Sequence, residues 1–215
     1  MNEAHLTVPR TARYYTLGQL TDATRHVWFV LHGYGQLAQF FLRRFDVVQN
    51  DDTFVVAPEG LSRFYLDGKY DRIGASWMTR EDRQHEIEDG IRYLNALWDT
   101  LFRTVDPAAV TIHLLGFSQG AVQACRWLQA GQIRADRLIL WAGFFPTGLQ
   151  TIIDRDRLAG VETFYVYGEQ DEYLVTIPDI RGYLQQIEAD MPGIRLLPYS
   201  GRHSVDREVL KSLVY

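Results

Sequence analysis

The sequence predicts an α/β fold, built on a mostly parallel, twisted β-sheet of about seven to eight strands with helices on both faces. Short runs of β-branched and aromatic residues recur along the 215-residue chain, and each run is almost continuously hydrophobic. Such runs are typical of strands that are covered on both faces of a sheet. Segments with a helical spacing of apolar residues separate them, and this alternation of strand and helix favours parallel strands.

Six buried strands are predicted in order along the chain. They cover residues 27–31, 53–57, 110–115, 138–141, 163–167 and 194–197. Two further runs, at 6–8 and 14–17, precede them and contain polar interruptions and a proline. Because proline cannot donate a hydrogen bond to a β-ladder, these two runs suit an antiparallel edge better than the centre of a sheet.

The clearest helix is predicted around residues 87–101. Apolar side chains recur there at steps of four, three, four and three, at Ile87, Ile91, Leu94, Trp98 and Leu101. This spacing places them on one core-facing stripe. Further helices are expected at 119–129, at 178–190 and from about residue 205. Only residues 142–162 separate two of the predicted strands, which is too short a segment for an inserted cap domain.

No internal repeat, low-complexity tract or Pro/Gly/Ser-rich linker divides the chain. A protein of this length buries roughly 70% of the surface that its unfolded form exposes, which is enough for one complete hydrophobic core. We therefore predict a single domain over residues 1–215. Residues 62–83 form the one long stretch without clear periodicity, and long irregular loops in compact domains are more often functional than not.

Composition limits the partners and cofactors. The formal net charge is −5, so the chain has no excess of basic residues with which to bind nucleic-acid phosphates. The single cysteine, Cys125, cannot form an intramolecular disulfide, and the absence of a CxxC pair or a His/Cys cluster excludes a thiolate zinc site. Neither a signal peptide nor a membrane span is recognisable. We expect no cofactor, no metal, no nucleic-acid partner, no membrane insertion and a cytoplasmic location.

The strongest functional motif follows the predicted strand 110–115. The pentapeptide Gly116-Phe117-Ser118-Gln119-Gly120 matches G-x-S-x-G and leads directly into a predicted helix. A turn this tight requires glycine at both flanking positions, and it lifts the serine hydroxyl to the edge of the sheet. The helix N-terminus behind the serine offers backbone N–H groups where an oxyanion would form. Ser118 is therefore predicted to be a nucleophile.

A serine hydroxyl needs a base to accept its proton and an acid to orient that base. Asp171 follows the predicted strand 163–167, although Glu169 and Glu172 in the same loop are alternatives. His203 follows the last predicted strand and is the one histidine in the corresponding downstream position. The three side chains would meet at the carboxyl edge of the sheet, where α/β proteins bind their ligands.

The second half of an oxyanion hole is predicted after the first central strand. An oxyanion needs two N–H donors from separate segments. The turn His32-Gly33-Tyr34-Gly35 supplies one of these segments. The proposed donors are the backbone amides of Tyr34 and Gln119.

Together these segments resemble the α/β-hydrolase superfamily, and within it the small phospholipase/carboxylesterase group that includes acyl-protein thioesterases. The resemblance spans about residues 25 to 213. It is carried by Leu31-His32-Gly33-Tyr34-Gly35, Gly116-Phe117-Ser118-Gln119-Gly120, Tyr167-Gly168-Glu169-Gln170-Asp171 and Gly201-Arg202-His203. The segment Ala75-Ser76-Trp77, followed by the helix that begins near Glu86, also resembles a region of that group in which a tryptophan precedes an acidic helix start.

The resemblance implies a role for each matching residue. Ser118 would be the nucleophile, Asp171 the acid and His203 the base. The oxyanion amides would come from Tyr34 and Gln119, and the resemblance implies that His32 supports the loop rather than acting as the base.

The sequence departs from the group at three positions. Ala121 and Arg202 replace glycines, and Tyr34 replaces a smaller aliphatic residue. None of these changes removes a reacting group. The tyrosine and the nearby Phe144 imply an aromatic-walled acyl or aryl pocket. Its predicted substrate-binding residues are Tyr34, Trp77, Phe144 and Leu174.

We therefore predict a serine esterase that acts on small carboxylic or thioester substrates without a cofactor, as a monomer or homodimer. A hydrolase of a carbon–carbon or amide bond with the same triad is an alternative. So is a catalytically silent binding protein, since fold alone does not decide function.

Overall fold

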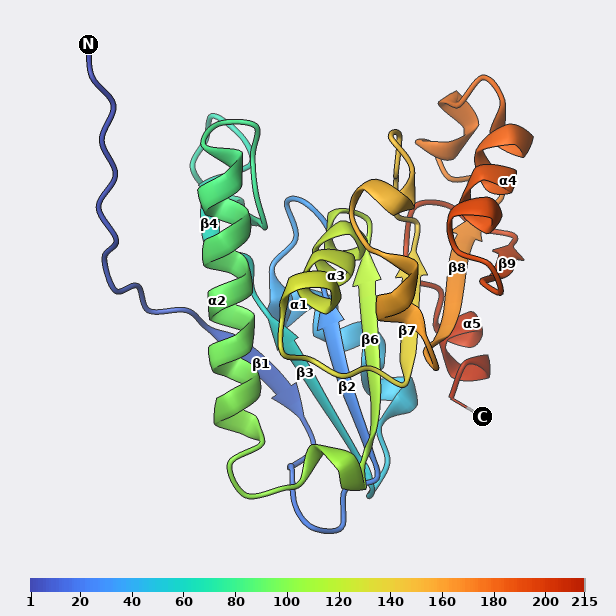
Figure 1. The fold of residues 1–215 in the computed structure, drawn as a ribbon, viewed down its shortest axis with the longest axis horizontal. Coiled ribbons are helices and arrows are strands. Elements are labelled where there is room, and N and C mark those ends of the chain that lie inside the picture. Colours follow the sequence, from blue (N-terminus) through green and yellow to red (C-terminus); the bar gives the residue numbers. More distant parts are fainter. Residues whose placement is uncertain (215) are drawn as a thin grey trace.

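The predicted α/β architecture is confirmed by a computed structural model, which describes residues 1–214 (Figure 1). Seven strands form the central sheet in the order β1-β3-β2-β6-β7-β8-β9. They are β1 (Tyr14–Leu17), β2 (His26–Leu31), β3 (Thr53–Pro58), β6 (Thr111–Phe117), β7 (Arg137–Trp141), β8 (Glu162–Gly168) and β9 (Arg195–Tyr199). The strand β1 runs antiparallel to β3 at one edge, and the other neighbouring pairs are parallel. All parallel strands therefore end at the same edge.

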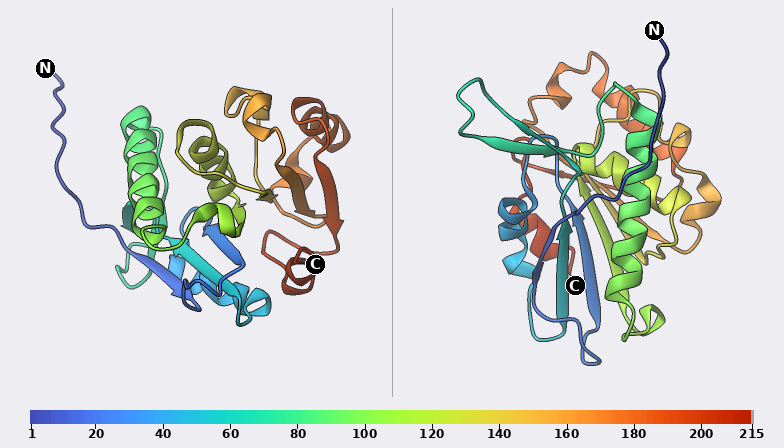
Figure 2. Two further views of the ribbon diagram at one scale, coloured as in Figure 1. Left: turned by 60° about the horizontal axis from the view of Figure 1, so that its bottom comes forward. Right: turned by 90° about the vertical axis from the view of Figure 1, so that its left-hand side faces the viewer.

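Helices cover both faces of this sheet (Figure 2). Successive residues of β2 belong to different hydrophobic clusters, with Val27 and Phe29 in one and Trp28 and Val30 in the other, because strand side chains alternate between faces. The first cluster includes residues of α2 (Arg83–Leu101), α3 (Gln119–Ala130) and α4 (Ile180–Asp190). The second includes residues of α1 (Ala38–Phe41), the 3₁₀ helix η1 (Leu42–Val48) and α5 (Arg207–Ser212).

The long helix α2 begins four residues before its predicted apolar stripe and ends with it. Leu94 and Trp98 are buried, whereas Ile87, Ile91 and Leu101 are half-buried. The stripe therefore faces the core as its spacing predicts.

Two local predictions are wrong. Residues 6–8 form no strand and instead belong to an extended N-terminal segment that runs beside α2 (Figure 1). Residues 6–8 do not join the sheet because β1 already occupies its edge, and the neighbouring Pro9 has no N–H to donate to a β-ladder. The irregular stretch 62–83 contains an antiparallel hairpin of β4 (Ser62–Tyr65) and β5 (Ile73–Ser76). Burial alternates along β4, but its residues Ser62-Arg63-Phe64-Tyr65 do not alternate between polar and apolar types, so the sequence carries no strand pattern there.

The segment between β7 and β8 carries two short 3₁₀ helices, η3 (Leu149–Thr151) and η4 (Arg155–Leu158), and no cap domain within the described chain. Short 3₁₀ turns also lie at η2 (Pro107–Ala109) and η5 (Leu174–Thr176). Among residues 1–214, no helix combines the length and the apolar character needed to cross a membrane.

Candidate active site

Ser118 lies on a strained turn between β6 and α3. Its backbone has φ 54° and ψ −116°, a conformation that costs a non-glycine residue about 1–3 kcal/mol. The Ser118 N–H donates to the Trp141 carbonyl oxygen at 2.8 Å, which ties the turn to the neighbouring strand β7. A Cβ atom on Gly116 would lie 2.3 Å from the Gly120 carbonyl oxygen, and one on Gly120 would lie 2.2 Å from the Leu31 carbonyl oxygen. The two glycines therefore permit the turn, as predicted.

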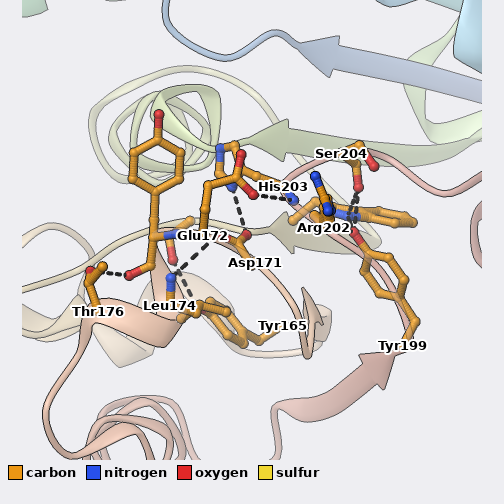
Figure 3. Close-up of polar contacts among 12 residues, drawn as sticks. Tyr165, Asp171, Glu172, Leu174, Thr176, Tyr199, Arg202, His203 and Ser204 are labelled. Carbon is orange, nitrogen blue, oxygen red and sulfur yellow. Dashed lines mark hydrogen bonds and ion pairs between the residues drawn. The ribbon is translucent and has the colours of Figure 1, made fainter.

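Asp171 and His203 form a direct pair in the loops after β8 and β9 (Figure 3). His203 Nδ1 lies 2.7 Å from Asp171 Oδ2. The other carboxylate oxygen of Asp171 accepts hydrogen bonds from the backbone N–H groups of Tyr173 at 2.9 Å and Leu174 at 3.4 Å. The Asp171 side chain is 1% exposed, so the carboxylate is fixed in place. This leaves Nε2 as the free nitrogen of the His203 ring.

The neighbouring carboxylates occupy other positions. Glu172 is exposed and accepts a hydrogen bond from the backbone N–H of His203 at 3.3 Å. Backbone N–H groups of Glu172 and His203 lower the pKa of its carboxyl. Glu169 is also exposed. Within residues 1–214, Asp171 is the one carboxylate bonded to the His203 ring, so the geometry favours it over the two alternatives.

The loops that carry Asp171 and His203 are bonded to one another. The Gln170 N–H donates to the Gly201 carbonyl oxygen, and the Glu169 N–H donates to the Tyr199 carbonyl oxygen, both at 2.9 Å. These bonds extend the pairing of β8 and β9 beyond the strands. The two loops, and with them Asp171 and His203, are therefore held as one unit.

Phe117, which precedes Ser118, brings the serine turn against this unit. Its ring centroid lies 4.8 Å from that of His203. Among the described residues, Ser118 Oγ and His203 Nε2 make no hydrogen bond. Catalytic hydrogen bonds are often formed only when substrate is bound, and the two groups sit on adjoining segments.

His32 holds the peptide group that would supply an oxyanion donor. Its Nε2 accepts a hydrogen bond from the Gly60 N–H at 2.9 Å, so Nδ1 carries the proton and donates to the Gly33 carbonyl oxygen at 2.8 Å. That carbonyl belongs to the same peptide as the Tyr34 N–H, which has no partner in residues 1–214. Burial lowers the pKa of His32 to about 4, so the ring is neutral at pH 7.

Glu59 is a further support that the sequence analysis missed. Its buried carboxylate accepts hydrogen bonds from the Ala38 N–H at 3.2 Å and from Arg13 Nε at 2.6 Å. It lies just after β3, next to the Gly60 amide that bonds His32. A carboxylate directly after a buried strand was the available sequence signal. Glu59 thus joins Arg13 in the N-terminal region to the start of α1, a few residues after Tyr34.

Gln119 contributes to the site through both its backbone and its side chain. It is the first residue of α3, so its N–H has no partner within the helix. Its Oε1 accepts from the Trp77 N–H at 3.0 Å, and its Nε2 donates to the Met78 carbonyl oxygen at 2.8 Å. The side chain therefore ties the start of α3 to the segment that follows β5.

Replacing Gln119 by alanine is expected to destabilise the protein by about 1–3 kcal/mol, because the partly buried Trp77 N–H loses its acceptor. The Met78 carbonyl oxygen loses one donor and keeps the Ser76 hydroxyl at 2.7 Å. Urea unfolding at pH 7 measures this loss. The exposed Gln84→Ala variant, on the surface of α2, should stay within about 0.5 kcal/mol of the wild type. Equal stability of both variants would show that the side-chain bonds of Gln119 contribute nothing.

The protein is expected to lose stability as the pH falls from about 6.5 towards 4. Burial lowers the pKa of His32 to about 4 and that of His113 to about 3, both below the ordinary value of 6.5. In this range the unfolded chain binds more protons than the folded one, so the stabilisation is complete above pH 6.5. Between pH 7 and pH 5 each histidine should cost about 2 kcal/mol of unfolding free energy in urea titrations.

His113→Phe provides the control for this pH effect. His113 lies far from the candidate site, at the start of β6, and its ring stacks on Trp28 with centroids 4.2 Å apart. Phenylalanine preserves a stacking ring without a titrating group. The variant should lose about half of the pH dependence, and an unchanged slope would contradict the assignment to these histidines.

The four residues predicted to line a substrate pocket differ in exposure. Tyr34 is 59% exposed and Phe144 is 50% exposed. Trp77 and Leu174 are buried. The Trp77 indole N–H donates to the His32 carbonyl oxygen at 2.8 Å, and the Leu174 backbone bonds Asp171. The two exposed rings therefore offer far more surface to a ligand than the two buried side chains.

Cys125 is unsuited to act as a nucleophile. Its side chain is fully buried in α3, and burial raises the pKa of its thiol to about 12. The thiol therefore stays protonated at neutral pH.

The chain has the α/β-hydrolase fold. The features that define this class are the parallel sheet with its antiparallel edge, the strand–serine–helix turn and the two loops at the carboxyl edge of the sheet. The chain superposes on Zea mays acyl-protein thioesterase 2 with a TM-score of 0.68 and 15% identity, covering 95% of this chain and 96% of that one. It superposes on a Bacillus cereus carboxylesterase with a TM-score of 0.63 and 16% identity, covering 94% of this chain and 92% of that one.

Esterase PE8 is also similar in fold. The TM-score is 0.59 at 20% identity, and the match covers 95% of this chain and 97% of the esterase. No family profile and no curated protein matches the sequence. At these identities the likeness concerns the fold alone.

Proposed function

We propose that the protein is a serine hydrolase that cleaves small carboxylic esters or thioesters through an acyl-enzyme on Ser118. The observation that carries the proposal is the bond between buried Asp171 and His203, with the strained Ser118 turn packed against the histidine through Phe117. A buried carboxylate on Nδ1 selects the tautomer in which Nε2 can accept a proton. Ester-cleaving proteins are among the solved structures with this fold.

In the first half of the reaction, Ser118 Oγ attacks the acyl carbonyl carbon and His203 Nε2 takes the hydroxyl proton. Asp171 stabilises the imidazolium that forms. The proton then passes to the leaving alcohol or thiol, and the acyl group stays on Ser118. In the second half, His203 accepts a proton from water as the water oxygen attacks the acyl carbonyl carbon. The bond between that carbon and Ser118 Oγ then breaks, His203 returns its proton to Oγ, and the carboxylic acid leaves.

The tetrahedral intermediates of both halves carry a negative oxygen. The backbone N–H groups of Tyr34 and Gln119 are the proposed donors to it. The His32 bond to the Gly33 carbonyl oxygen supports the first donor, because a peptide held at its C=O is also held at its N–H. Removing one such donor from an enzyme typically costs about 10²–10³-fold in kcat.

The substrate is proposed to bind against aromatic surface beside the serine turn. Tyr34 packs on Phe64 with ring centroids 5.0 Å apart, and the ring centroids of Phe144 and Tyr183 are 5.8 Å apart. These exposed rings suit an apolar acyl or aryl group. Trp77 and Leu174 would lie below these rings, where Trp77 fixes the turn that carries Tyr34 and Leu174 fixes the loop that carries Asp171.

Labelling with a fluorophosphonate tests the proposal directly. The reagent forms a covalent adduct with an activated serine, so we expect one adduct on Ser118 by peptide mass spectrometry and none in the Ser118→Ala variant. A folded wild-type protein without an adduct would instead favour the catalytically silent alternative. A panel of esters, thioesters and amides then distinguishes the proposed substrates from other bonds.

Three broader predictions accompany this function. We propose that residues 1–215 form a single domain, which is supported by the coverage of 95% in the superposition on the thioesterase. The cytoplasmic location and the monomeric or homodimeric state stay predictions from the sequence.

A further inference from the structure

The N-terminal segment, residues 1–13, lies beside α2 (Figures 1 and 2). A cavity of about 690 Å³ separates the segment from the helix. Leu6 and Val8 line it on one side, and Tyr93 and Leu97 of α2 line it on the other. Trp77 also lines this cavity, whereas Ser118, Asp171 and His203 do not.

At this cavity, His5 of the N-terminal segment meets Asp82 and His85 at the start of α2. His5 Nε2 lies 3.4 Å from Asp82 Oδ2, and His85 Nδ1 lies 2.6 Å from Asp82 Oδ1. The imidazole rings of His5 and His85 have centroids 4.2 Å apart. One donor atom from each of the three side chains lies within 4.8 Å of the others. Glu3 adds a carboxylate oxygen 3.1 Å from His5 Nε2.

We propose that His5, Asp82 and His85 bind a zinc ion that fastens the N-terminal segment to the start of α2. Two imidazole nitrogens and a carboxylate oxygen are a common ligand set for this metal, with water completing the tetrahedron. Imidazole ligands favour zinc over magnesium and calcium, which prefer all-oxygen sites.

The geometry needs only a small adjustment. Ligand atoms about 2.0–2.1 Å from a tetrahedral zinc ion lie roughly 3.3 Å from one another. The His5–Asp82 separation of 3.4 Å is close to this value, whereas the His85–Asp82 hydrogen bond of 2.6 Å must lengthen by about 0.7 Å. All three side chains are exposed and have room to do so.

The ion would hold a part of the segment that has few other attachments. Arg10 donates to the Leu61 carbonyl oxygen, Arg13 pairs with Glu59, and Tyr93 Oη donates to the Arg13 carbonyl oxygen at 2.9 Å. These contacts fasten residues 10–13. In residues 1–9, His5 contacts Asp82 and His85, and zinc would strengthen this attachment to α2.

Calorimetric titration of ZnCl₂ into untagged full-length protein at pH 7.5 tests the site. We expect saturable binding of one zinc ion per chain and a loss of affinity of about tenfold or more in His5→Ala and in His85→Ala. Thr7→Ala and Asp89→Asn are matched controls, because both residues line the same cavity without belonging to the cluster. Absence of saturable binding, or equal affinity in all four variants, would overturn the proposal.

Limited proteolysis separates a fastened segment from adventitious surface binding. Trypsin can cut after the exposed Arg10, and zinc should slow the release of residues 1–10 in the wild type but not in His5→Ala. Mass spectrometry follows the intact and shortened chains. An identical cleavage rate with and without saturating zinc would contradict the fastening of the segment. This result is independent of the esterase proposal.

Discussion

Replacing Ser118 by alanine is expected to lower kcat/KM for p-nitrophenyl ester hydrolysis by about 10⁴-fold or more, which corresponds to about 5.5 kcal/mol of transition-state stabilisation. Alanine has no oxygen to form the acyl-enzyme, so the covalent route is lost. The oxyanion donors and the substrate surface remain, and these account for the residual rate above water that triad variants of hydrolases keep. Initial rates at saturating and limiting ester measure the effect.

The fold should tolerate this change. The Ser118 Oγ makes no hydrogen bond within residues 1–214, and alanine leaves the backbone bond to Trp141 intact. The melting temperature should therefore stay close to that of the wild type. Ser212→Ala, which alters an exposed serine in α5, should retain full activity. Unchanged turnover in Ser118→Ala would rule out the proposed nucleophile, whatever the outcome with the control.

The main features of the site were predictable because they follow from local chain geometry. A buried run, a Gly-x-Ser-x-Gly turn and a helix must place the serine at a strand end. The loops after β8 and β9 then lie at the same edge, since parallel strands end together. For this reason Asp171 and His203 could be expected to meet although 32 positions separate them.

Other features depend on side-chain contacts that no local pattern records. Glu59 bonds the start of α1 only because β3 lies beside β2, which places its carboxylate at the Ala38 N–H. The role of the Gln119 side chain depends on the path taken by the chain after the β4–β5 hairpin. The histidine–aspartate cluster was equally hidden, because it needs the N-terminal segment to leave the sheet and follow α2.

Replacing Asp171 by asparagine is expected to lower kcat by about 10⁴-fold without unfolding the protein. The backbone N–H groups of Tyr173 and Leu174 require an acceptor, so the asparagine oxygen should keep those two bonds. Its NH₂ group must then face His203 Nδ1 and donate to it. This forces the proton of the neutral ring onto Nε2, where it blocks acceptance of the Ser118 proton. Ester hydrolysis and thermal unfolding measure the two effects.

Glu172→Gln is the matched control, because it removes a carboxylate one residue away. Glu172 is exposed and contacts the His203 backbone rather than the ring. Glutamine keeps an oxygen for that N–H, so the rate should change by no more than a few-fold. If the glutamine variant lost activity while Asp171→Asn kept it, the acid of the proposed triad would be Glu172. Loss of activity in Asp171→Asn alone would instead assign the orientation of His203 to the buried pair 2.7 Å apart.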